Sequence, residues 1–100
     1  MTVRHVVCIT WAPDARPEDI AAASDAVAAL PALIPDIRAF SVGRDLGLAP
    51  GTADLAIVAD FDSTDAWQRY QDHPEHQRVL GEHLRPLMAA RAAVQFDLTS

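Results

Sequence analysis

Four stretches of the chain show the two-residue alternation, or the short apolar run, that is typical of a β-strand. These predicted strands span residues 3–11, 37–46, 54–61 and 91–98. The first and third are apolar at both parities, and successive side chains of a strand point to opposite faces of a sheet. We therefore expect both faces of these two strands to be covered.

The segments between the predicted strands carry apolar residues at helical spacing. One helix is expected to begin at Pro17, because proline suits the first helical position, and Pro31 should kink or end its regular part. Ser63 is the expected N-cap of a second helix. Pro74 should break that helix and begin a third, which the spacing of apolar residues extends to Leu87.

The element order β-α-β-β-α-α-β indicates a single α+β domain over residues 1–100. It predicts a ferredoxin-like sandwich, with four antiparallel strands in one sheet and the helices on one of its faces. The other face would then carry apolar side chains without a cover. A second copy of the sheet would cover it and give a homodimer whose two sheets close into an α+β barrel. The alternative is that a small exposed sheet tolerates these apolar positions.

The formal net charge of −6 argues against nucleic acid and against an anionic membrane surface as partners. All eight basic residues are arginines, and they are scattered along the chain. No apolar run approaches the ~20 residues of a membrane-spanning helix, and the N-terminal segment lacks the features of a signal peptide. The one cysteine, Cys8, cannot form an intrachain disulfide. That fits a reducing compartment, so we expect a cytoplasmic protein.

The segment "YQDHPEHQ" holds the one tyrosine, Tyr70, and two of the four histidines, His73 and His76. In structural terms it is a corner between two helices, with a first-turn proline and a histidine that precedes it in extended conformation. In functional terms, His76 lies on the apolar side of its helix, and His5 is in phase with apolar positions of the first strand. If the helices cover that face of the strand, both imidazoles enter the same space. A desolvated imidazole with a hydrogen-bonding neighbour can act as a general base near neutral pH.

Four segments together resemble the stress-responsive A/B-barrel (Dabb) domain family across essentially the whole chain. They are the opening "RHVV", the middle "IPDIRAFSVGRDL", the strand "DLAIVADFDS" and the corner "YQDHPEHQ". The resemblance implies a ferredoxin-like fold and a dimeric α+β barrel. It also makes the chain similar to the olivetolic acid cyclase-type polyketide cyclases of that family. Such enzymes perform an intramolecular aldol condensation on a linear poly-β-keto thioester without a cofactor.

By this resemblance, His76 is the general base, Tyr70 binds the thioester end or polarises a carbonyl, and His5 supports the pocket. Val27 stands where the cyclase has a further pocket tyrosine, so the resemblance implies similar machinery with a different pocket wall. The residues expected to contact the substrate are Val27, Val7, Ile9, Trp11, Leu80 and His73.

The function expected on these grounds is that of a cofactor-independent cyclase or lyase acting on a β-keto or polyketide-like small molecule. One alternative is a non-catalytic dimeric barrel that binds a small hydrophobic ligand or serves in a stress response. Another is a cofactor-independent monooxygenase of the same fold class. A metal site is disfavoured, since no cysteine or carboxylate completes a recognisable ligand spacing with the histidines. An open cavity where the three residues converge would favour catalysis, and a pocket packed shut would favour the non-catalytic barrel.

Overall fold

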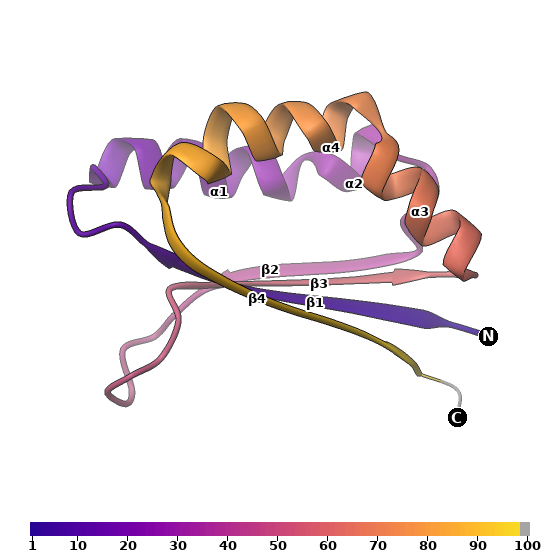
Figure 1. The fold of residues 1–100 in the computed structure, drawn as a ribbon, viewed down its shortest axis with the longest axis horizontal. Coiled ribbons are helices and arrows are strands. Elements are labelled where there is room, and N and C mark those ends of the chain that lie inside the picture. Colours follow the sequence, from indigo (N-terminus) through magenta and orange to yellow (C-terminus); the bar gives the residue numbers. More distant parts are fainter. Residues whose placement is uncertain (99–100) are drawn as a thin grey trace.

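Four antiparallel strands form the sheet of this protein, and the helices pack on one of its faces (Figure 1). The computed structural model describes residues 1–98. In chain order the elements are β1 (Val3–Trp11), α1 (Pro17–Ala28), α2 (Leu30–Leu33), β2 (Ala39–Arg44), β3 (Leu55–Phe61), α3 (Thr64–Asp72), α4 (Pro74–Val79), a π-helical turn (Leu80–Leu84), a 3₁₀ turn (Arg85–Leu87) and β4 (Met88–Asp97).

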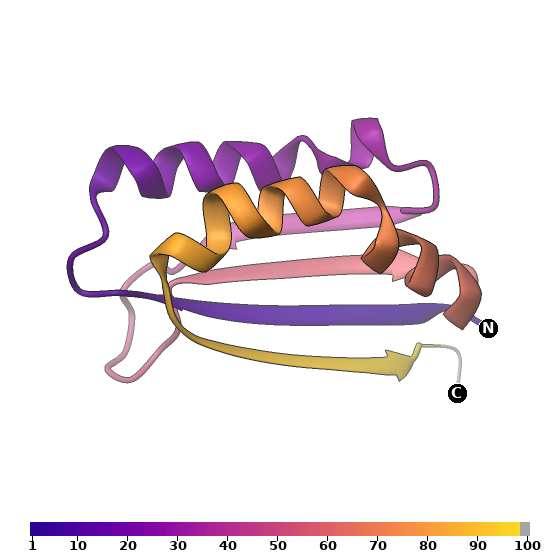
Figure 2. The same ribbon diagram turned by 45° about the horizontal axis from the view of Figure 1, so that its top comes forward.

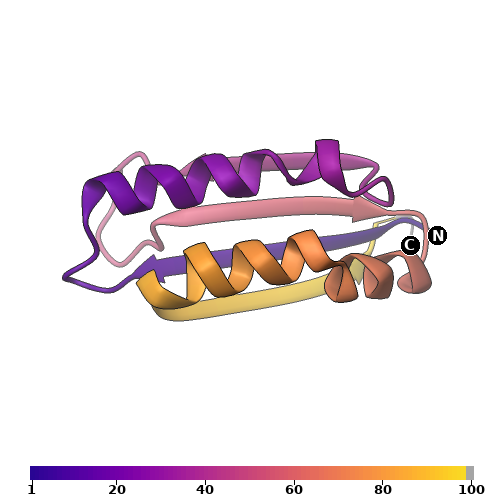
Figure 3. The same ribbon diagram turned by 90° about the horizontal axis from the view of Figure 1, so that it is seen from above.

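The strand order is β2-β3-β1-β4, so β1 lies between β3 and β4 and pairs antiparallel with both (Figure 2). Seen from the helical side, α1 lies over β2 and β3, whereas α4 lies over β1 and β4 (Figure 3). This arrangement confirms the predicted ferredoxin-like α+β fold with a four-stranded antiparallel sheet.

The hydrophobic core lies between the sheet and the helices. Alternate residues of the two central strands face the helices and are buried: Val3, His5, Val7 and Ile9 on β1, and Leu55, Ile57, Ala59 and Phe61 on β3. The helical layer adds Ala23, Val27, Leu30, Ala66, Tyr70 and Val79. Full burial of each large apolar side chain contributes about 1.5–3 kcal/mol. His5 is thus a polar ring at a position where its neighbours on the strand are core residues.

The predicted starts and breaks of the first two helical segments are confirmed. α1 begins at Pro17 and ends at Ala28, and Pro31 lies in the first turn of the separate short helix α2. A proline ring clashes with the carbonyl four residues back, so a regular helix cannot run through position 31. Ser63 caps α3, since its Oγ accepts a hydrogen bond from the backbone N–H of Ala66 at 3.0 Å.

The third predicted helix does not continue as an α-helix to Leu87. It is α-helical only as far as Val79, and a π-helical and a 3₁₀ turn follow. Pro86 has no N–H to donate to the carbonyl of Glu82, so the regular ladder of hydrogen bonds cannot extend through it. Within residues 1–98, no helix combines the length and the hydrophobicity needed to cross a membrane.

The second strand is also shorter than predicted, since β2 covers Ala39–Arg44 rather than 37–46. The chain leaves the sheet there and enters a loop that turns at Gly47, whose φ is +73°. The side chain of Asp45 holds this loop, accepting hydrogen bonds from the N–H of Gly47 at 3.0 Å and the hydroxyl of Thr52 at 2.9 Å. Turn chemistry therefore ends the strand before its apolar pattern does.

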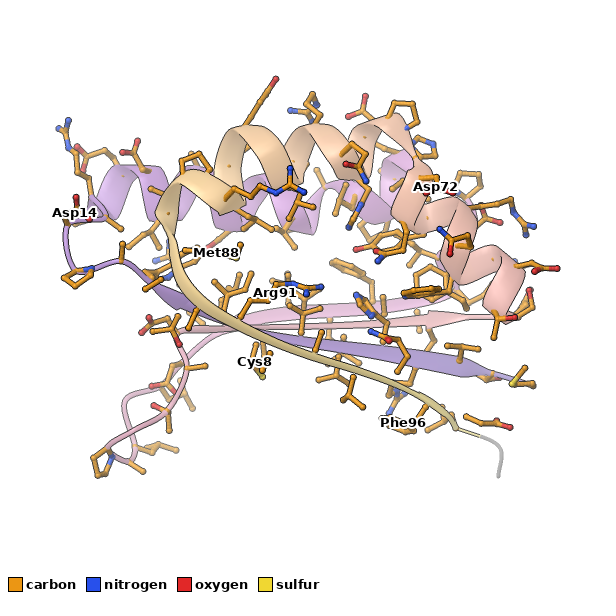
Figure 4. The ribbon with its side chains drawn as sticks, viewed as in Figure 1. Cys8, Asp14, Asp72, Met88, Arg91 and Phe96 are labelled. Carbon is orange, nitrogen blue, oxygen red and sulfur yellow. The ribbon has the colours of Figure 1, made fainter. Side chains whose placement is uncertain are left out.

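The sheet face away from the helices is largely apolar. Val6 pairs with Val58 on one side and with Val94 on the other, so three valines lie side by side across β3, β1 and β4. Cys8 and Phe96 point away from the helices on this same face (Figure 4). Val94 is 55% exposed in the single chain. This surface is called the open face below.

Candidate functional site

A cavity of about 510 Å³ lies between the sheet and the helices. Half of its lining residues are apolar, and its polar side chains come from β1, α3, α4, the 3₁₀ turn and β4. The apolar lining residues are Val7, Ile9, Val27, Leu30, Ile57, Val79, Leu80, Leu84 and Met88. The space is therefore open rather than packed shut, and it is large enough for a small organic molecule.

The structure brings together His5, Tyr70 and His76 at this cavity, which all three line. The ring centroids of Tyr70 and His76 are 4.4 Å apart, and those of Tyr70 and His5 are 6.0 Å apart. Phe61, a fully buried residue, packs against Tyr70 with a centroid separation of 5.0 Å and holds that ring in the core. The tyrosine is thus close to two imidazoles that are 71 positions apart in the sequence.

The break at Pro74 is what places His76. The backbone N–H of Glu75 would bond the carbonyl of Gln71 in a continuous helix, but here it donates to Nδ1 of His73 at 3.1 Å. The carbonyl of Gln71 is therefore released and accepts from Nδ1 of His76 at 3.1 Å. The corner between α3 and α4 is a structural device that also orients a ring at the cavity.

This bond determines which nitrogen of His76 is basic. A carbonyl oxygen only accepts hydrogen bonds, so Nδ1 of His76 carries the hydrogen and Nε2 keeps its lone pair. Burial lowers the pKa of His76 below its usual 6.5, and the charges of Arg91 and Arg85 act in the same direction, while the bond to the Gln71 carbonyl opposes them. His76 is thus a neutral imidazole at neutral pH, with Nε2 available as a base.

His5 is held in the opposite tautomer. An indole N–H only donates, and Nε1 of Trp67 donates to Nδ1 of His5 at 3.4 Å. The amide of Gln95 lies 2.8 Å from the same nitrogen and therefore presents its NH₂ group. Burial, followed by the charges of Arg91 and His76, lowers the pKa of His5 to about 4. His5 is consequently a neutral ring whose Nε2–H is a hydrogen-bond donor.

Tyr70 is a donor as well. Burial raises the pKa of its hydroxyl to about 12, although the charge of Arg91 opposes this effect. The phenol therefore stays protonated at neutral pH. Two neutral donors and one neutral base at the same cavity can remove a proton from a bound molecule and stabilise the negative charge that develops on oxygen.

Of the residues expected to contact the substrate, Val7, Ile9, Val27 and Leu80 line the cavity. Trp11 and His73 do not. Trp11 follows an irregularity in the pairing of β1 with β4 and packs at the margin of the core. Nδ1 of His73 is occupied as the N-cap of α4.

Sequence reasoning missed several polar residues that line the cavity: Gln68, Gln71, Asp72, Gln77, Arg85 and Arg91. Arg91 lies opposite Ile9 in the pairing of β4 with β1, so it shares the helix-facing side of the sheet. Only this register, which the sequence does not contain, would have indicated it. Oε1 of Gln71 is a buried acceptor without a protein partner within residues 1–98, so it is available to a bound molecule.

The side chains of residues 1–98 include no group of three or more His, Cys, Asp or Glu placed to share a metal ion.

Comparison with known proteins identifies the family. The Stress responsive A/B Barrel Domain (Dabb) matches residues 3–98. A dimeric ferredoxin-like protein of unknown function from Thermobifida fusca YX is 41% identical, with a TM-score of 0.91, over 98% of this chain and 92% of that one. A dimeric protein of unknown function with a ferredoxin-like fold from Bacteroides fragilis NCTC 9343 is 31% identical, with a TM-score of 0.81, over 97% and 96%.

A hydroxynitrile lyase from Passiflora edulis shares the fold, with a TM-score of 0.83 and 17% identity over 95% of this chain and 91% of that one. No curated protein matches the chain. The match of the family to nearly every described residue, together with the two relatives above 30% identity, decides the assignment. The chain belongs to the stress-responsive A/B barrel (Dabb) domain family.

Proposed function

We propose that this chain is a cofactor-independent enzyme that removes a proton from a carbon between two carbonyl groups. The reaction is an aldol-type cyclisation, or a related lyase reaction, of a β-keto or polyketide-like substrate. The observation that carries the proposal is the unprotonated Nε2 of His76, on a ring that lines the cavity beside the protonated Tyr70. A base next to a hydrogen-bond donor is what enolate formation requires.

In the proposed step, Nε2 of His76 takes the proton and the C–H electron pair moves to the carbonyl oxygen. The hydroxyl of Tyr70 donates to that oxygen as it becomes an enolate, and Nε2–H of His5 is a second donor for the substrate or a water. The enolate carbon then attacks another carbonyl of the same molecule, and the resulting alkoxide takes the proton back from His76. General-base and oxyanion contributions of this kind are each about 10²- to 10³-fold.

The apolar walls favour a second candidate function, that of a non-catalytic barrel which binds a small hydrophobic ligand. Val27 and Leu30 from the helical layer face Val7 and Ile57 from the sheet across the same cavity. Such walls would hold the carbon chain of a substrate equally well, so they do not distinguish an enzyme from a binding protein. Proton transfer distinguishes the two functions, because only the enzyme would exchange a carbon-bound hydrogen of its ligand.

The proposal is tested by deuterium exchange at C2 of methyl 3-oxooctanoate in D₂O, followed by proton NMR. We expect Tyr70→Phe to lower the protein-catalysed rate by about 10²-fold, because the ring and its packing remain while the donor to the enolate oxygen is lost. Unchanged thermal unfolding of the variant is the control for folding. If the native protein does not accelerate exchange at any concentration, the ligand-binding barrel is the better description.

We also propose that two copies associate through the open face. The relatives from Thermobifida fusca and Bacteroides fragilis are described as dimeric, and the three valines of this face would be buried by a second sheet. Two such sheets would close into an α+β barrel. Cys8, on the same face, is a free thiol, which suits a reducing compartment and favours a cytoplasmic location.

Val94→Glu is expected to convert the dimer to a monomer, because it places a charge within the apolar surface that the second sheet would bury. Sedimentation equilibrium should give twice the 10.8 kDa chain mass for the native protein and the single chain mass for the variant. The matched control is Leu33→Glu, which changes an exposed apolar residue of α2 in the helical layer instead. A dimeric Val94→Glu protein, or a monomeric control, would contradict this interface.

A further inference from the structure

The eight arginines divide into two groups. Within residues 1–98, six have a hydrogen-bond or ion-pair partner for the side chain, namely Arg4, Arg16, Arg38, Arg44, Arg69 and Arg78. Arg85 and Arg91 have none, and these are the two arginines that line the cavity. The protein therefore supplies a partner for each guanidinium outside the site and leaves those at the site free.

Arg91 is the more central of the two. It lies opposite Ile9 in the sheet and extends from β4 into the layer between sheet and helices (Figure 4). Its charge influences the pKa of His5, Tyr70 and His76, so it lies near all three rings, whereas Arg85 acts only on His76 among them. Arg91 is solvent-exposed in the single chain and lines the cavity, so it offers a free guanidinium beside the group that we propose to be catalytic.

The cavity contains little negative charge to balance Arg91. Asp72 is the one carboxylate among the lining residues of the described chain, and both of its oxygens lie 3.2 Å from the amide nitrogen of Gln68. It belongs to the helical corner, whereas Arg91 comes from the sheet below (Figure 4). The two imidazoles and the phenol are neutral at neutral pH. A bound anion would complete the site.

From this arrangement we infer that the substrate carries a carboxylate, which Arg91 binds through its planar pair of N–H donors, and an apolar chain, which the cavity walls hold. The inference rests on the proposed function and names its substrate class, a poly-β-keto acid with an apolar chain. The carboxylate charge alone would oppose formation of an enolate on the neighbouring carbon. A guanidinium beside it offsets that charge, so the same contact that selects the substrate also eases proton removal by His76.

The balance of the step is unchanged by the carboxylate. The C–H bond breaks, its proton moves to Nε2 of His76, and its electron pair is delocalised onto the keto oxygen that faces Tyr70. The carboxylate remains bound to Arg91 throughout. Neither an oxidant nor a reductant is required.

Binding of an unreactive probe tests this inference separately from catalysis. Octanoate and octanamide share one carbon chain and differ in charge, and calorimetric titration gives the affinity of each. We expect octanoate to bind the native protein at least 10-fold more tightly than octanamide, and Arg91→Gln to remove this difference. Arg16→Gln, which changes an exposed arginine that pairs with Glu18 outside the cavity, should retain it.

Equal affinities in the native protein, no octanoate binding, or a preference that survives in Arg91→Gln would overturn the inference. Circular dichroism shows whether Arg91→Gln is folded. If it is folded poorly, Arg91→Lys replaces it in the test, because the lysine preserves the charge and should retain part of the preference for octanoate. Separate results distinguish a failure of this inference from a failure of the proposed function. If octanoate binding depends on Arg91 but the native protein exchanges no deuterium at C2 of 3-oxooctanoate, which carries the carboxylate, the site binds carboxylates without catalysis. If exchange depends on His76 but octanoate shows no preference, the enzyme stands and the carboxylate does not.

Discussion

Replacing His76 by asparagine is expected to reduce protein-catalysed deuterium exchange to the level of the reaction without protein, a loss of at least about 10²-fold. The asparagine amide nitrogen falls near the place of Nδ1, so it can still donate to the carbonyl of Gln71 and preserve the corner. What it removes is Nε2, the one atom assigned as the base. The variant therefore separates the structural role of His76 from its proposed catalytic role.

The matched control is His83→Asn. His83 lies in the π-helical turn, is half-buried and does not line the cavity, so its replacement should leave the exchange rate within about twofold of native. A second readout is the pH profile. Because the pKa of His76 is lowered from 6.5, the acid limb of the native rate should lie below pH 6.5, with a plateau through neutral pH. An equal loss in both variants would indicate general destabilisation, and an active His76→Asn protein would place the base elsewhere.

Much of the fold follows from local chemistry that the sequence displays. The strand Val3–Trp11 has the predicted bounds because its β-branched residues and its helix-facing apolar parity favour the same conformation. The helices begin at the predicted positions, which are marked by Pro17, Ser63 and Pro74. The missing N–H of a proline and the hydroxyl of a serine cap affect only the adjacent turn of the helix. Signals of this kind need no knowledge of distant residues.

The parts that could not be predicted depend on contacts between distant residues or on competing local bonds. Arg91 reaches the cavity because of the register of β4 on β1, and a shift by one residue would have turned it to the open face. The tautomer of His5 depends on Trp67 and Gln95, 62 and 90 positions away. His73 was expected to contact the substrate, but a local bond to the N–H of Glu75 engages its ring.

The candidate site and the helix corner share one cause. Pro74 removes the regular helix, His73 satisfies the N–H that the break would leave unpaired, and the carbonyl of Gln71 becomes free to orient His76. The same carbonyl also accepts a hydrogen bond from the side-chain amide of Gln77 at 2.6 Å, so two donors of α4 converge on it and His76 is one of them. The geometry of the break therefore links the fold to the proposed chemistry through a single backbone oxygen.

The stability of the protein is expected to fall by about 3 kcal/mol between pH 6.5 and pH 4 because of His5 alone. Its pKa is 6.5 in the unfolded chain and about 4 in the fold, so in this range the unfolded state binds the extra proton and the folded state does not. Acidification therefore favours unfolding. The contribution of neutral His5 to the stability is fully present above pH 6.5 and is lost as the pH falls toward 4. His76 acts in the same direction, whereas the lowered pKa of Asp60, held by Arg4, confines its effect to pH below about 3.8.

Urea unfolding at pH 7 and pH 4.5, at one fixed protein concentration, measures this loss. Gln95→Glu provides the sharpest comparison. It places a carboxylate beside Nδ1 of His5, where the amide lies 2.8 Å away in the native chain, and a nearby negative charge raises the pKa of an imidazole. The variant should therefore lose less stability on acidification than the native protein, while His5→Asn should lose least, since it has no ring to protonate. If all three proteins lose the same free energy between the two pH values, the acid sensitivity does not originate at His5, and the neutral donor assigned to this ring loses its physical basis.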